Sequence, residues 1–121
     1  MAVVHKADEI ERANFFDQLS DRIEKARDGK DQIDASTTVH ISNIGTANMR
    51  LGVPVVVTPA VATIAIGEVR NEPVPDEDNP AGFKFTKTAS LTMAFDHRVM
   101  NGVGAASFLN QIRELAANFT I

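Results

Sequence analysis

The chain has 121 residues, of which 44% are apolar, and a formal net charge of -4 at neutral pH. This length fits one domain with its own hydrophobic core, so we expect residues 1–121 to form a single domain. Because the chain has no cysteine, disulfides, thiolate metal ligands and a cysteine nucleophile are excluded. The acidic balance and the shortage of aromatic residues argue against a nucleic acid as partner.

The first sixteen residues, "MAVVHKADEIERANFF", become charged within six positions. That is too early for the apolar centre of a signal peptide, and no apolar run in the chain approaches the length of a membrane span. We therefore expect a cytoplasmic protein that does not associate with a membrane.

A helix is predicted between Asp8 and Ala26, where apolar residues recur at spacings of three and four. Asp8 is the candidate N-cap, and Gly29 follows the periodic segment as a signal for the end of the helix. The apolar stripe consists of Ile10, Ala13, Phe16, Leu19, Ile23 and Ala26.

Strands are predicted next. "TTVHISNIG" (37–45) is a short strand in which His40 and Ser42 face one side and Val39 and Ile41 the other. "VPVVVTPAVATIAIGEV" (53–69) is rich in β-branched residues but interrupted by proline, which predicts two short buried strands.

"RNEPVPDEDNPAG" (70–82) combines prolines with acidic residues and is predicted to be a solvated loop. "FKFTKTASLTMAF" (83–95) alternates again, with Leu91, Met93 and Phe95 on one face. After Gly102 the spacing becomes helical. Its apolar stripe consists of Ala105, Ala106, Phe108, Leu109, Ile112, Leu115 and Ala116. This order of elements predicts an α/β fold, with a mixed β-sheet packed against helices.

The stretch "FDHRVMNGVGAASFL" (95–109) places His97 directly after a strand and before an Asn-Gly turn and a helix. Ligand sites tend to lie where strands of a sheet end. Histidine titrates near neutral pH, so it can take a proton from a hydroxyl or a thiol and return it. Histidines at strand ends are also commonly structural, and that alternative stays open at this point.

This stretch resembles the His-x-x-x-Asp-Gly signature of the acyltransferase components of 2-oxoacid dehydrogenase complexes, which share a fold with chloramphenicol acetyltransferase. Residues 3–30 resemble the family's helix, residues 37–45 its Thr-Ile-Ser-Asn-Leu-Gly strand, and residues 57–69 its proline-containing strand. These segments occur in the family's order over nearly the whole chain. The resemblance covers only the C-terminal half of the family's catalytic domain.

The resemblance implies acyl transfer between coenzyme A and a dihydrolipoamide-type thiol, both of them substrates. His97 would be the general base that makes the attacking thiolate, and Ser42 would donate a hydrogen bond to the oxyanion of the tetrahedral intermediate. Asn101 stands where the commonest form of the signature has aspartate, and it would orient the site. From the residues alone, Ser42 could equally end a strand or start a turn.

The resemblance also implies a homotrimer in which serine and histidine meet across a subunit boundary. The apolar surface that the other half of the domain covers must be buried by self-association or by a second chain that supplies the missing half, unless the sequence is a fragment. Two alternatives therefore stay open: a non-catalytic assembly or regulatory module, and one half of a split acyltransferase.

The remaining polar residues suggest no further chemistry. His5 and His40 do not share a metal-ligand spacing with His97, so we expect no metal. Asp96 and Arg98 are expected to pair with other charges and so hold the loop around His97. Arg50, in a predicted loop, could meet a substrate phosphate but is expected to face water.

Overall fold

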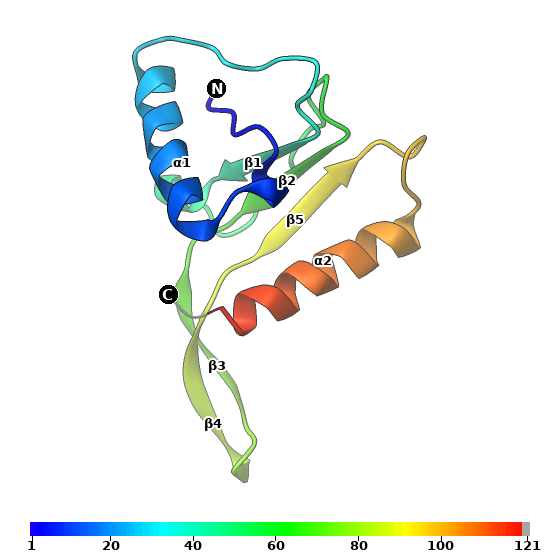
Figure 1. The fold of residues 1–121 in the computed structure, drawn as a ribbon. Coiled ribbons are helices and arrows are strands. Elements are labelled where there is room, and N and C mark those ends of the chain that lie inside the picture. Colours follow the sequence, from blue (N-terminus) through cyan, green and yellow to red (C-terminus); the bar gives the residue numbers. More distant parts are fainter. Residues whose placement is uncertain (120–121) are drawn as a thin grey trace. The chain divides into compact units, whose positions relative to one another are not determined.

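The computed structural model describes residues 1–119 and divides into two compact units, Met1–Thr38 and Val39–Ile121. Figure 1 shows the elements of both units, which are described separately below. The expectation that residues 1–121 form a single domain stays a prediction.

The first unit contains the predicted helix as α1, Arg12–Arg27, preceded by a short 3-10 helix, η1, Ala7–Glu9. The predicted cap at Asp8 is wrong. Asp8 lies within η1, and the extended backbone of Ile10 separates η1 from α1, so that Glu11 occupies the N-cap position without a capping side-chain bond. The apolar periodicity located the helix but not its first residue.

The end of α1 forms as predicted at Gly29, which has a φ of 81°. The amide of Gly29 donates to the carbonyl of Ala26, and the amide of Lys30 donates to that of Lys25. This pair of bonds is the Schellman motif, which needs a residue in the left-handed region and therefore favours glycine.

The second unit is built on a mixed three-stranded sheet, as predicted. Its strands are β1, Val39–Asn43, β2, Ala62–Ile66, and β5, Leu91–Phe95, in the order β1-β2-β5. The central strand β2 runs parallel to β1 and antiparallel to β5. The β5 register confirms that Leu91, Met93 and Phe95 share one face, because alternate residues of a strand project to the same side.

Only one of the two strands predicted in residues 53–69 forms, namely β2. Residues 53–61 contain no regular strand. Pro54 and Pro59 lack the amide donors that a ladder requires. Val53 and Val55 are 90% and 75% exposed, so the β-branched residues that suggested a buried strand lie largely on the surface.

The predicted loop at residues 70–82 is wrong, because most of it belongs to an antiparallel hairpin. Strand β3, Arg70–Asp76, pairs with β4, Asn79–Thr88, and the hairpin extends away from the three-stranded sheet (Figure 1). Pro73 and Pro75 are two residues apart, so their backbone nitrogens point to the same side of β3. That side is the outer edge of the two-stranded ribbon, where no amide donor is needed.

Helix α2, Gly102–Ala117, confirms the second predicted helix and lies along β5 in Figure 1. Its buried side is narrower than the predicted stripe. Ala105 is buried and Leu109 and Ile112 are half-buried, whereas Ala106 is exposed and Leu115 is 73% exposed.

The buried core of the second unit consists mainly of small side chains. Its buried apolar residues are Ala60, Ala62, Ile64, Ala65 and Ala105. Several large apolar side chains are instead exposed, among them Ile41, Phe83, Phe85 and Val103. Exposed apolar surface of this kind commonly marks a contact with another protein.

Candidate active site

The turn that carries His97 is organised by the backbone of Asp96, which follows β5. The amide of Asp96 donates to the carbonyl of Val61 at 2.8 Å, which ties the turn to the start of β2. The carbonyl of Asp96 accepts from the amides of Val99 and Met100 at 3.0 and 3.2 Å. The backbone on both sides of His97 is therefore fixed by hydrogen bonds.

The side chain of Asp96 strengthens the same turn through Arg98. The two groups form an ion pair with a distance of 2.6 Å between Arg98 Nη2 and Asp96 Oδ2, and the Arg98 amide also donates to Asp96 Oδ1 at 2.9 Å. These bonds lower the pKa of Asp96 to about 2. The hydrogen bonds from the Arg98 guanidinium have the largest effect, and the bond from the Arg98 amide has the next largest. The two residues thus pair with each other and not, as expected, with other charges.

Replacing Arg98 by alanine is expected to raise the pKa of Asp96 from about 2 towards its ordinary value of 3.8. The hydrogen bonds and the ion pair stabilise the ionised form of Asp96. Their contribution to the stability of the fold is therefore present above pH 3.8 and disappears as the pH falls towards 2. A carboxyl-carbon NMR titration of Asp96 measures this shift, with Arg113→Ala as the control. An unchanged Asp96 titration in Arg98→Ala would contradict the assignment.

The His97 side chain is exposed and lies against the ring of Phe95, with 4.8 Å between the ring centroids and an interplanar angle of 51°. Within residues 1–119, neither ring nitrogen of His97 hydrogen-bonds to another residue. Both nitrogens are therefore accessible to a substrate or to another chain.

Asn101 lies at the N-cap of α2, immediately after the His97 turn. Its side-chain oxygen accepts a hydrogen bond from the Gly104 amide at 2.8 Å. Such a cap typically stabilises a helix by about 1 kcal/mol. Asn101 therefore fixes where α2 begins, at Gly102, five residues after His97.

Ser42 is an exposed residue of β1, which is an edge strand of the sheet. The ladder to β2 continues beyond it, since the amide of Ile44 donates to the carbonyl of Ile66 at 3.0 Å. Past this point the chain turns, and the Asn43 side chain accepts from the amide of Gly45 at 3.0 Å. The hydroxyl of Ser42 is thus presented near the end of the strand.

The structure does not bring Ser42 and His97 together within one chain. Ser42 lies in the same register row as Ala65 and Thr92, whereas Phe95 lies in the row of Val39. Three residues along a strand and two strand spacings each correspond to about 10 Å. His97 lies beyond Phe95, so direct contact between the two side chains of one copy is excluded.

Arg50 is exposed, as expected, and it also forms an ion pair. Its Nη2 lies 2.5 Å from Glu72 Oε1, which joins the loop after β1 to strand β3.

His5, in the first unit, lies 3.5 Å from Asp34. Within residues 1–119 no cluster of three or more histidine or acidic side chains could hold a metal ion. No helix within these residues has the length and apolarity to span a membrane.

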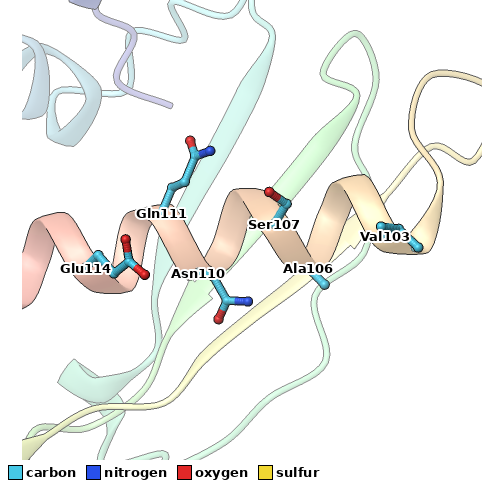
Figure 2. A pocket seen from close by; sticks show the side chains of 7 residues that line it. Val103, Ala106, Ser107, Asn110, Gln111 and Glu114 are labelled. Carbon is cyan, nitrogen blue, oxygen red and sulfur yellow. The ribbon is translucent and has the colours of Figure 1, made fainter.

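A shallow hollow runs along the exposed side of α2. All of its lining residues belong to this one helix, and Figure 2 shows their side chains arranged along it. The labelled residues are Val103, Ala106, Ser107, Asn110, Gln111 and Glu114. The hollow includes neither His97 nor Ser42, so it is separate from the candidate site.

The fold and these residues define a mixed-sheet protein in which a fixed histidine turn and an exposed edge-strand serine lie far apart. Residues 1–120 match the family model of the 2-oxoacid dehydrogenase acyltransferase catalytic domain. The chain therefore belongs to this family.

Individual relatives agree with this assignment. The chain is 31% identical over 118 residues to the dihydrolipoyllysine-residue acetyltransferase component of the pyruvate dehydrogenase complex of Staphylococcus aureus, and 30% identical to that of Staphylococcus epidermidis. Each match covers 96% of this chain and 27% of the relative. The chain thus spans about a quarter of the length of these curated relatives.

Solved structures show the same fold. The cubic core of a pyruvate dehydrogenase multienzyme complex superposes with a TM-score of 0.82 at 27% identity, over 97% of this chain and 48% of that chain. The dihydrolipoamide acetyltransferase of Azotobacter vinelandii also gives 0.82, at 26% identity. The latter structure was studied for the catalytic roles of a serine, a histidine and an asparagine.

Proposed function

We propose that this chain transfers an acyl group between coenzyme A and a dihydrolipoamide-type thiol, in a site shared by two copies. The observation that carries the proposal is the placement of His97 and Ser42, which are both exposed but lie at opposite ends of the sheet. A second copy is needed to place the serine of one chain beside the histidine of another. The acyltransferases of the same family support the chemistry.

In the proposed reaction, a ring nitrogen of His97 removes the proton of the attacking thiol. A free thiol has a pKa of about 8.5, so it needs a base to react efficiently at neutral pH. The thiolate attacks the thioester carbonyl, and the oxyanion that forms accepts a hydrogen bond from the Ser42 hydroxyl. Collapse of the intermediate breaks the original carbon–sulfur bond, and the leaving thiolate takes the proton back from His97.

Asn101 and Asp96 have positioning roles in this proposal. Asp96 fixes the turn that carries His97 through its backbone bonds and its ion pair with Arg98. Asn101 fixes the start of the helix that follows the turn. Neither residue has to exchange a proton with substrate, and the reaction as written needs no metal.

We further propose that the chain is cytoplasmic and self-associates, as a homotrimer or a multiple of one. The similarity to the cubic core of a multienzyme complex and the exposed apolar side chains of the second unit support self-association. Because the chain spans 48% of that core protein, a second chain that supplies the other half of the domain belongs to the same proposal.

The second candidate function is an assembly or regulatory module without turnover. The small buried core of the second unit favours it.

Acyl transfer from acetyl-coenzyme A to dihydrolipoamide, measured beside the mass of the assembly by light scattering, separates the two functions. The enzyme is expected to be an oligomer with turnover. An oligomer without turnover supports the module, and a monomer contradicts the shared site.

A further inference from the structure

His40 is a titratable residue in the second unit that the proposed reaction does not use. It is the only buried residue of β1, at 8% exposure, while the other four residues of that strand are exposed. Its Nε2 atom is buried without a hydrogen-bond partner among the described residues. A buried polar atom without a hydrogen-bond partner normally destabilises a protein, so such atoms are rare and each needs a physical explanation.

The Thr63 side chain on β2 has the same unusual property. Thr63 is 6% exposed, and its Oγ1 is also buried without a hydrogen-bond partner among the described residues. His40 and Thr63 are register partners in the parallel β1–β2 ladder. Adjacent strands lie about 4.8 Å apart, so the two side chains are neighbours on one face of the sheet.

This pair of residues lies next to the candidate oxyanion donor. His40 and Ser42 are two residues apart on β1, so they project from the same face of the strand. Because β1 is an edge strand with four exposed residues, the ladder to β2 and the burial of His40 are what hold Ser42 in place.

We propose that one water molecule bridges His40 Nε2 and Thr63 Oγ1, and that this bridged pair positions Ser42 for the acyl-transfer step. His40 is then a positioning residue that acts through Ser42 and does not touch the substrate. The inference rests on the proposed function for its catalytic consequence, but its structural part can be measured without turnover.

Hydrogen exchange at the Ser42 amide gives the structural test. The Ile44 amide donates to β2, and alternate residues of a strand direct their amides to the same side, so the Ser42 amide also faces β2. His40→Ala is expected to accelerate its exchange about tenfold, the effect of losing one buried hydrogen bond. His40→Gln retains a polar group of similar reach and is expected to restore most of the protection.

Two further variants keep this test specific. Ile41→Ala changes a neighbour that is 70% exposed on the opposite face, and it is expected to leave Ser42 exchange unchanged. Thr63→Val keeps the shape of the partner side chain and is expected to accelerate Ser42 exchange as His40→Ala does. The Ala94 amide of β5 faces β2, because the Asp96 amide two residues further on donates to the carbonyl of Val61. Equal acceleration at the Ser42 and Ala94 amides would indicate global destabilisation and overturn the proposal, as would no effect in Thr63→Val.

A double-mutant cycle on the acyl-transfer rate tests the catalytic part. His40→Ala is expected to lower kcat about tenfold in the normal chain but to have little further effect in a Ser42→Ala background. Independent, multiplying effects would overturn the positioning role. If kcat were unchanged in both Ser42→Ala and His97→Ala, the proposed function would be contradicted. The exchange result for His40 would still stand.

Discussion

His97→Ala is expected to reduce the rate of acyl transfer by about 10²–10⁴-fold, the usual contribution of a positioned general base. The proposed reaction needs His97 to form the thiolate and to return the proton to the leaving thiol. The exposed ring has no hydrogen-bond partner among residues 1–119, so its removal should disturb the fold little. Steady-state kinetics with acetyl-coenzyme A and dihydrolipoamide measure the loss.

His5→Ala is the matched control for this prediction, because His5 is another exposed histidine and lies in the first unit. Its activity and its assembly mass should equal those of the parent chain. If His97→Ala retains the parent rate while keeping the parent mass, His97 is not the base.

Ser42→Ala is expected to lower kcat by about 10²–10³-fold, which corresponds to about 3–4 kcal/mol of transition-state stabilisation. The hydroxyl donates to an oxyanion that exists only after the thiolate has attacked. Its loss should therefore reduce kcat while changing the KM for either substrate little.

Ser20→Ala, an exposed substitution on α1, is the control for the loss of a serine hydroxyl. A rise in KM with an unchanged kcat in Ser42→Ala would show that Ser42 binds the substrate rather than the oxyanion. That result would contradict the assigned role.

The sequence predicted the segments that determine the family but not all of the supporting structure. The strand around Ser42, the strand ending at Phe95 and the helix after Gly102 all formed where they were predicted. The apolar alternation did not give the buried face of β1, where His40 is buried and Ile41 is exposed. The strand before Pro59 did not form, since apolar composition alone cannot tell a buried segment from an exposed one.

The hairpin was missed for a related reason. Prolines predict a loop when the pairing of a segment is unknown, but at Pro73 and Pro75 they occupy the outer edge of a two-stranded ribbon. Which edge of β3 is the outer one can be known only once its pairing with β4 is known.

Predicting the separation of His97 and Ser42 also requires the register of the strands, which no local sequence pattern contains. The sequence did place His40 and Ser42 on one face. The burial of His40 beside Thr63 depends on the pairing of β1 with β2, so it could be seen only in the structure.

Mixing the two inactive variants, His97→Ala and Ser42→Ala, tests the shared site most directly. After joint unfolding and refolding in equal amounts, each site receives its histidine and its serine from two independently chosen copies. About a quarter of the sites should then contain both residues, so acyl transfer should return to about a quarter of the parent rate. A mixture that stays as inactive as its components, while forming the same assemblies as the parent chain, would contradict a site shared between copies.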